Sequence, residues 1–252
     1  MHMPDSSIKT EILIHDLKVP LSVIDAGAKS MLNRPEVYGP LTEKQAKVLR
    51  RIIRNATVTQ RLVNDVLELG RSREGVMHLT EFTLGDLITQ VLVEVFDLSH
   101  PGAADAVRRA GGLDAVIEAA GGGGIRLDIS ARVWETRVRL DAPKTRQIVR
   151  NLLTNAVKHR REIAGIRGEL PRGTSEVVLG VWDDGRGIPP QDHVRIFDTY
   201  FTTGGSIESA IESHGLGLAG VMILLKDMGG SLKLLSEDGQ GAEFRITLPL
   251  KL

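Results

Sequence analysis

The N-terminal architecture is decided by the stretch IHDLKVPLSVIDAGAKSM, residues 14–31. Its apolar side chains recur at alternating steps of three and four residues, at Ile14, Leu17, Leu21, Ile24, Ala28 and Met31. A repeat of about 3.5 residues is typical of a helix that packs in a bundle or coiled coil. We therefore expect one long helix that ends near Asn33-Arg34-Pro35, where proline marks a break.

A second long helix is predicted to start at Thr42, because Thr42 and Gln45 have the spacing of a capping box. Its seam repeats the same spacing at Val48, Ile52, Asn55, Thr59, Leu62, Val66 and Leu69, beside a second stripe at Leu49, Ile53, Ala56, Val63 and Leu67. Two helices with such broad apolar faces cannot close a core alone. The simplest solution is a helical hairpin that dimerises into a four-helix bundle.

Composition limits the classes of function. Lys and Arg, 32 in all, balance 32 Asp and Glu, which argues against nucleic acid or an anionic membrane as the main partner. The absence of cysteine excludes disulfides and thiolate chemistry. No apolar run approaches the ~20 residues of a membrane span. We expect a cytoplasmic chain without membrane contact of its own, and the start Met1-His2-Met3 is compatible with upstream sensor or membrane segments being absent.

Beyond a polar boundary at Arg71–Gly75 the pattern becomes mixed, which suggests domains at 1–75 and 76–252. Strands are predicted at 125–129, 136–140, 177–182, 231–235 and 243–248, and helices at about 84–97, 143–159 and 215–228. Neighbouring strands without a helix between them predict an α+β layer with helices on one face. Residues 99–124 form an unusual insert, with a helix over 103–120 and a flexible joint at Gly121–Gly124.

His15 is a candidate nucleophile. Ile14 and Leu17 belong to the seam, so the neighbouring His15 ring is expected to reach water, where an imidazole with a pKa near ~6.5 is largely neutral. Asp16 can accept a hydrogen bond from one ring nitrogen and leave the other free to attack. Pro20 removes a helical N–H and predicts a local kink. The same segment is equally compatible with an ordinary surface histidine.

Asn55 and Thr59, with Gln60 beside them, make the second seam polar, and counting back from the connection places them level with His15. Such a layer either softens the bundle there or specifies the register of its helices.

Four segments of the second domain suggest a nucleotide site. Asn151, Asn155, Lys158 and His159 share one helical face, and amide oxygens with an ammonium suit hydrated Mg²⁺ and phosphates. Asp183 ends a strand before Gly185 and Gly187. An aromatic anchor and a mobile lid are predicted at 196–206, and Gly215-Leu216-Gly217 opens a helix whose N–H groups can face an anion. Taken singly, these are also compatible with a solvated polar face or a plain β-turn.

In this order the segments resemble the phospho-acceptor box and the N, G1, F and G2 boxes of bacterial sensor histidine kinases. The resemblance implies a dimerisation and histidine-phosphotransfer domain followed by a Bergerat (GHKL) α+β sandwich. It implies ATP and Mg²⁺ as cofactors, autophosphorylation of His15 with Asp16 as its partner, and transfer of the phosphoryl group to an Asp of a response-regulator receiver domain.

The resemblance also assigns individual roles in nucleotide binding. It implies Asn155 as the main Mg²⁺ ligand, with Asn151 nearby, and it places Lys158 near the phosphates and His159 near the base. It places Asp183 at the adenine amino group and Gly185 and Gly187 in the pocket wall. The residues that it places beside the phosphates at the start of the last helix are Gly215, Leu216 and Gly217.

Several positions depart from the family pattern. Val19 stands where the family has Thr or Asn to orient a water, which argues against phosphatase activity. Ser213 replaces a glycine, and Asp184 and Arg186 replace Asn and Pro, so that Asp184 adds negative charge near the triphosphate and Arg186 offsets it. The segment 160–175 is longer and more basic than the family predicts.

Two alternatives remain: a non-enzymatic phosphotransfer or scaffold protein with a degenerate nucleotide domain, and an ATP-driven conformational machine, which would need no acceptor histidine.

Overall fold

A computed structural model divides the chain into two units, Met1–Gly75 and Val76–Leu252. It describes the backbone of residues 6–73, 77–97, 99–197 and 217–251; side chains before Leu17, and most of those between Gln60 and Met77, lie outside the description. Among the helices so described, none combines the length and the hydropathy needed to cross a membrane.

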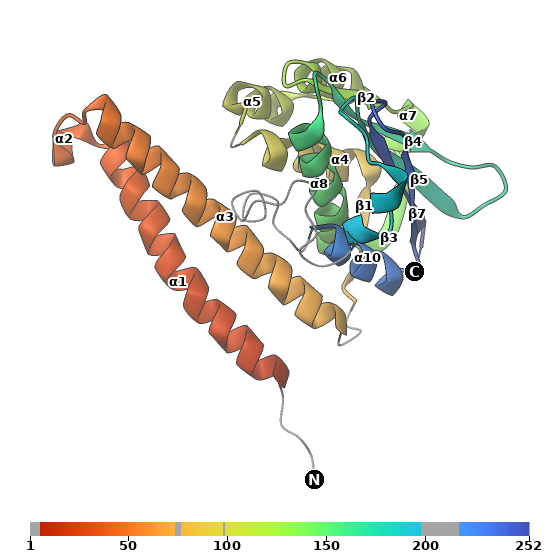
Figure 1. Cartoon of the computed structure of the whole chain (residues 1–252), viewed down its shortest axis with the longest axis horizontal. Coiled ribbons are helices and arrows are strands. Elements are labelled where there is room, and N and C mark those ends of the chain that lie inside the picture. The colour runs from red at the N-terminus through yellow and green to blue at the C-terminus, as the bar shows by residue number, and fades with distance from the viewer. Residues whose placement is uncertain (1–5, 74–76, 98, 198–216, 252) are drawn as a thin grey trace, which may run out of the picture. The chain divides into compact units, whose positions relative to one another are not determined.

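The first unit is a helical hairpin (Figure 1). Helix α1 (Ser6–Asn33) runs without interruption through Pro20, the short helix α2 (Pro35–Tyr38) follows, and α3 (Glu43–Arg73) returns along α1. The predicted capping box is confirmed: the Thr42 N–H donates to Gln45 Oε1 at 2.9 Å, and the Gln45 N–H donates to Thr42 Oγ1 at 3.3 Å. These reciprocal bonds satisfy orphan donors and set the start of α3.

The hairpin buries one apolar stripe and leaves another in contact with solvent. Among the hairpin side chains that the structure describes, the buried ones are Ala28 on α1 and Leu49, Ala56 and Val63 on α3. Leu17, Ile24 and Met31, each seven residues from the next, are 44%, 49% and 40% exposed, and Val48 and Ile52 of the α3 seam are exposed as well. A single copy therefore does not cover the seam.

The helix register differs from the one predicted. Gln60 Nε2 donates to Ser22 Oγ at 3.3 Å, which places the polar layer of α3 level with Ser22 and not with His15. Seven residues separate Ser22 from His15, so the layer lies about 10 Å further along the helix axis. Equal counting failed because residues 35–38 form α2 on one side of the connection, which shifts its midpoint.

The second unit contains a sheet of five strands in the order β2-β4-β5-β7-β6 and a two-stranded sheet of β1 and β3. The strands are β1 (Leu79–Thr83), β2 (Ile125–Asp128), β3 (Arg137–Asp141), β4 (Ala164–Glu169), β5 (Glu176–Asp183), β6 (Ser231–Ser236) and β7 (Ala242–Pro249). The helices are α4 (Leu84–Phe96), α5 (Pro101–Arg109), α6 (Leu113–Gly121), α7 (Ala131–Trp134), α8 (Ala142–His159) and α10 (Gly217–Asp227), with 3₁₀ turns η1 (Pro190–Asp192) and η2 (Arg195–Phe197). The predicted α+β layer and all five predicted strands are confirmed; β1 and β4 were not predicted.

The core lies between the five-stranded sheet and the helices. Helix α8 packs on β4 and β5, α10 packs on β6 and on α8, and α4 packs on α8 (Figure 1). Alternate residues of β5, at Val177, Leu179 and Val181, are fully buried. Because side chains on a strand alternate with a period of two, the next residue on the same face is Asp183, at the end of β5.

The segment 160–175 contributes a strand to the five-stranded sheet. It contains β4, which pairs with β5 as an antiparallel hairpin and with β2 in parallel. On the other face of the sheet the Trp182 ring lies over Gly165, where an added Cβ would stand 2.4 Å from the ring, and the Arg167 guanidinium lies 5.5 Å from the ring centroid. One of the basic residues of the segment thus packs on this tryptophan.

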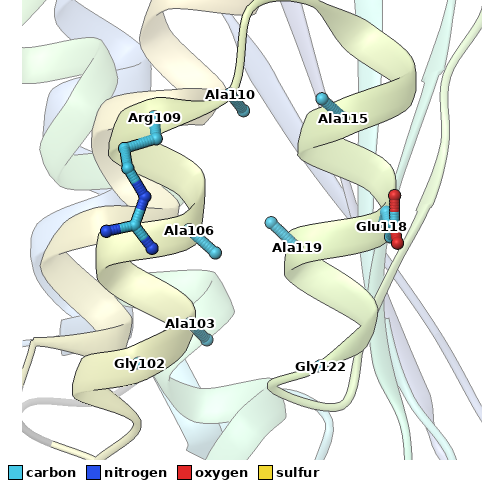
Figure 2. Close-up of a pocket in the computed structure, with 9 residues that line it drawn as sticks. All are labelled: Gly102, Ala103, Ala106, Arg109, Ala110, Ala115, Glu118, Ala119 and Gly122. Atoms are coloured by element: carbon cyan, nitrogen blue, oxygen red, sulfur yellow. The ribbon is translucent and has the colours of Figure 1, made fainter.

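The insert forms two helices, where one was predicted. Helix α5 ends at Arg109 and α6 begins at Leu113, with Gly111 and Gly112 between them. The two helices line a groove of about 550 Å³, with small residues on its walls and Arg109 and Glu118 beside them (Figure 2).

The predicted flexible joint at Gly121–Gly124 is wrong. The Gly123 N–H donates to the Ala120 carbonyl at 3.0 Å, and Arg160 Nη1 donates to the Gly124 carbonyl at 2.8 Å. Gly123 is buried against the Phe96 ring, and a Cβ added to Gly123 would stand 2.1 Å from a carbon of that ring. The glycine run therefore makes a close-packed turn between α6 and β2.

Replacement of Gly123 by Ala is expected to destabilise the second unit. The new methyl group would overlap Phe96, and overpacking of this kind costs about 1–3 kcal/mol. Gly121→Ala is the matched control, since nothing lies within 4 Å of its added Cβ. Urea unfolding of both variants measures the difference, and equal stability of the two would contradict the packing described.

Candidate nucleotide site

Helix α8 supplies one wall of the candidate site. Asp141 caps its start, where Oδ1 accepts the Lys144 N–H at 3.1 Å, and the helix runs unbroken to His159. Its continuity places Asn151, Asn155 and Lys158 on one face, with the two asparagines half-buried and Lys158 exposed.

The end of β5 supplies a buried carboxylate. Asp183 is 8% exposed, and its Oδ1 accepts the Gly185 N–H at 2.9 Å. Burial raises the pKa of Asp183, the neighbouring Asp184 charge adds to the rise, and N–H donors at Gly185 and Ala242 oppose it. A carboxylate in such a place is a specific acceptor for an N–H donor such as an exocyclic amine.

The two glycines after β5 are required by contacts within the protein. A Cβ on Gly185 would stand 2.2 Å from the His159 carbonyl oxygen, so the loop touches the end of α8. Gly187 has a φ of +74°, and its Cβ would stand 1.9 Å from the Glu237 carbonyl oxygen. The place in the pocket wall that the resemblance implies for these two glycines gains no support here, because protein backbone already occupies both Cβ positions.

The turn between β6 and β7 holds this loop from the other side, and sequence reasoning missed it. Ser236 Oγ accepts the Ile188 N–H at 2.8 Å and donates to the Gly241 carbonyl at 2.7 Å. Gly241, with a φ of +81°, has no room for a Cβ, which would stand 2.0 Å from the Asp183 carbonyl oxygen. The closely spaced Gly239 and Gly241 between two predicted strands were the available signal.

Asp184 has a structural role that corrects the sequence interpretation. Its carboxylate accepts the N–H groups of Arg161, Glu162 and Ile163 at 2.8, 3.1 and 3.1 Å, where the chain leaves α8 for β4. Burial is the largest single influence and would raise the pKa of Asp184, but these donors together outweigh it and lower the pKa. The charge is thus engaged by backbone donors and is not an isolated negative charge beside the phosphates.

Three basic side chains lie near one another at the end of α8. The pKa of His159 is lowered, first by partial burial of the ring and then by repulsion from Lys158 and Arg186. The three side chains are therefore close enough to influence one another's charge. Such a cluster favours a polyanion, and a bound polyanion would relieve the repulsion.

Comparison with known proteins agrees with this geometry. Residues 11–75 match the family model of the His Kinase A (phospho-acceptor) domain, and residues 140–252 match that of the histidine kinase-, DNA gyrase B- and HSP90-like ATPases. The chain belongs to the sensor histidine kinases.

Individual relatives are distant but match nearly the whole chain. The kinase core is 29% identical over 237 residues to the sensor protein KdpD of Escherichia coli, covering 94% of this chain and 24% of that protein. It is 31% identical over 239 residues to the sensor histidine kinase ZraS of Salmonella typhimurium, covering 94% and 44%. The structure of full-length ShkA in complex with AMPPNP matches with a TM-score of 0.63 at 26% identity, covering 97% of this chain and 46% of that one. The chain thus spans less than half the length of each.

Some predicted site residues of the kinase core lie outside the described residues: Gly215, Leu216, Ser213, residues 198–201 of the aromatic anchor and the predicted lid at 202–206. Gly217 is the first residue of α10. His15 and Asp16 lie within α1, but their side chains are not described. In the described part of the chain there is no group of three or more His, Cys, Asp or Glu able to hold a metal.

The kinase core is expected to lose stability on Asp184→Ala. Three N–H groups at residues 161–163 would lose a charged acceptor, at a cost of about 1–3 kcal/mol. Because the folded-state pKa lies below the ordinary 3.8, this contribution is complete above pH 3.8 and is lost as the pH falls through the lowered pKa. Urea unfolding at neutral and acidic pH measures it; a gap between wild type and variant that persists unchanged below the lowered pKa would contradict this assignment.

Proposed function

We propose that this chain is an ATP-dependent histidine autokinase that phosphorylates His15 and passes the phosphoryl group to an aspartate of a response-regulator receiver domain. The observation that carries the proposal is the buried Asp183 carboxylate at the end of β5, next to the basic side chains at the end of α8. An acceptor for an amine and a cluster for a polyanion together fit an adenine nucleotide.

Each wall of the site takes one part of ATP. Asp183 accepts a hydrogen bond from the adenine amino group, which a guanine cannot offer at that position. Lys158 faces the phosphates with Arg186 near enough to add charge, and His159 lies near the base. Gly217 begins α10, whose N-terminal N–H groups favour a phosphate.

Asn155, with Asn151 one turn earlier, would hold Mg²⁺. Amide oxygens on a half-buried helical face suit this ion, which keeps several waters and is bound largely through substrate phosphates. When bound, Mg²⁺ neutralises charge on the phosphates. Lys158 contributes a further positive charge from the same face of α8.

The chemical step takes place at the His15 ring. One imidazole nitrogen attacks the γ-phosphorus in line, the N–P bond forms, and the bond to the bridging oxygen breaks with its electron pair leaving on ADP. The other ring nitrogen carries a proton that Asp16 accepts, so the product is a neutral phosphoramidate ring. Phosphoryl transfer of this kind depends mainly on positioning and electrostatics.

The exposed seam of the hairpin supports a homodimer as the working form. Leu17, Ile24 and Met31, together with Val48 and Ile52, would be buried by a second copy in a four-helix bundle.

Val19 is 52% exposed and offers the partner receiver domain an apolar contact near His15. Because valine cannot orient water, we propose kinase and phosphotransfer activity without phosphatase activity.

Incubation with γ-labelled ATP tests the proposal. We expect the wild-type chain to acquire label that is stable to base and labile to acid, as a phosphoramidate is, and His15→Ala to acquire none, because the proposal places the phosphoryl group on that ring. Asp183→Asn should reduce labelling at limiting ATP, since an amide can donate towards the adenine amino group. Equal labelling of wild type and His15→Ala would remove His15 from the mechanism.

The alternative of a degenerate nucleotide domain makes a different prediction, namely no Mg²⁺-dependent heat when ATP is titrated into the chain. Asp184 was part of the sequence support for degeneration, and its role in holding residues 161–163 removes that support.

Nucleotide binding is expected to raise the pKa of His159. In the free protein repulsion from Lys158 and Arg186 helps to hold this pKa below 6.5, and a triphosphate would compensate both charges. Binding of Mg-ATP should therefore tighten as the pH falls through the range between the lowered and the raised value. NMR titration of the ring with and without Mg-ATP measures the change, with His100 as an internal control; an unchanged His159 pKa would place the phosphates elsewhere.

A further inference from the structure

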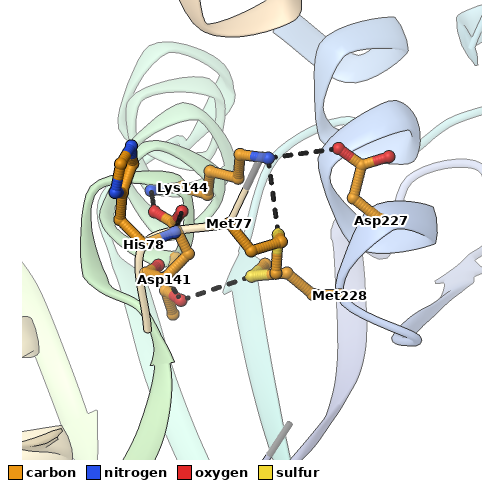
Figure 3. A network of polar contacts seen from close by, with 7 residues as sticks. Met77, His78, Asp141, Lys144, Asp227 and Met228 are labelled. Carbon is orange, nitrogen blue, oxygen red and sulfur yellow. Dashed lines mark hydrogen bonds and ion pairs between the residues drawn. The ribbon is translucent and has the colours of Figure 1, made fainter. Parts of the chain in front are cut away.

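A buried lysine stands at the opposite end of α8 from the candidate site. Lys144 is 2% exposed, and its Nζ lies 3.3 Å from Asp227 Oδ2, at the last residue of α10 (Figure 3). The same Nζ lies 3.5 Å from the sulfur of Met77. None of the roles proposed above uses this residue.

The surrounding contacts bring together three parts of the chain. The His78 N–H donates to Asp141 Oδ2 at 2.9 Å, while Oδ1 of the same carboxylate caps α8. Thr145 Oγ1 donates to the Asp141 carbonyl at 2.8 Å and lies 3.6 Å from the sulfur of Met228, which follows α10. The point where the chain enters the second unit, the start of α8 and the end of α10 are thus held at one place.

The far ends of both helices carry the nucleotide residues. Asn155 and Lys158 lie towards the end of α8, Gly217 begins α10, and the two helices pack against each other. Lys144 and Asn155 are about 16 Å apart along the helix axis, so a tilt of roughly 5° at the Lys144 end would move Asn155 by roughly 1.4 Å. Displacements of about 1 Å are enough to impair phosphoryl positioning.

Stability alone is a weak reason for a charged group here. Replacing a buried ion pair by apolar groups of similar volume is often neutral or stabilising, because the desolvation of both charges opposes their attraction. What the pair does provide is a directional contact that fixes the start of α8 relative to the end of α10.

We propose that Lys144 is a positioning residue, whose ion pair with Asp227 holds α8 and α10 in the arrangement that binds Mg-ATP and links that arrangement to the entering segment at Met77 and His78. The proposal rests on the proposed function. It adds a route by which a change where the chain enters the domain reaches the nucleotide.

The first test uses Lys144→Met in the full chain, with Lys144→Arg as the conservative variant and Lys226→Met as the matched control on exposed surface of α10. Calorimetry gives the Kd for Mg-ATP and thermal unfolding gives Tm. We expect the Kd of Lys144→Met to rise about tenfold and its Tm to fall, because Asp227 loses the charge that faces it, with Lys144→Arg restoring most of the affinity and Lys226→Met unchanged. An unchanged Kd in folded Lys144→Met would overturn the proposal.

The second test needs no variant. Coupling between two sites is reciprocal, so Mg-ATP should slow amide hydrogen exchange in the wild-type chain at residues 77–79 and 224–228 as well as around Asp183. Protection around Asp183 alone would overturn the proposal even if Lys144→Met failed to fold. A wild-type chain that binds no Mg-ATP in calorimetry would instead refute the proposed function, which keeps the two failures apart.

Discussion

The nucleotide domain depends on the point where β5 ends, because two consecutive carboxylates there have opposite environments. Asp183 continues the buried alternation of the strand, and its pKa is raised by burial. Asp184 faces the other way and accepts three backbone N–H groups, which lower its pKa. One carboxylate is thereby available to a ligand, while its neighbour binds the strand end to the chain that leaves α8. The candidate site exists because the period of a strand separates these two roles.

The loop that follows is held with little freedom. Gly185 meets the end of α8, Gly187 meets the turn after β6, and Gly241 meets the carbonyl of Asp183. Each approach is too close for any side chain. A site with its backbone held from two sides requires little rearrangement to present Asp183, which is the condition under which electrostatic recognition is most effective.

Much of this could be predicted from sequence where the signal was periodic or paired. The seam of α1, the Thr42–Gln45 cap and the five alternating strands were predicted because their spacing reflects contacts close in sequence. β4 was missed because Ala164 to Glu169 contains two glycines, Gly165 and Gly168, so that its sequence does not alternate clearly between apolar and polar side chains although Ala164 and Ile166 are buried on one face.

Most of the remaining errors concern contacts between distant residues. The glycine run at 121–124 was predicted to be a flexible joint because the residues that hold it, Phe96 and Arg160, are distant in the sequence. The polar layer of α3 was misplaced because the short helix α2 was not foreseen. Asp184 was interpreted as a negative charge near the triphosphate because its backbone partners at residues 161–163 are more than 20 residues away in the sequence. Composition and periodicity carry no information about such partners.

The packing of Trp182 over Gly165 has a practical consequence. The chain has two tryptophans, Trp134 and Trp182, and both belong to the second unit. Each ring lies against a glycine, Trp134 on Gly85 and Trp182 on Gly165, so unfolding would change the surroundings of both. Tryptophan fluorescence therefore reports on the ATPase-like domain alone, while the hairpin, which has no tryptophan, contributes to circular dichroism but not to that emission. The two halves of this molecule can be melted in one cuvette and followed separately without any label.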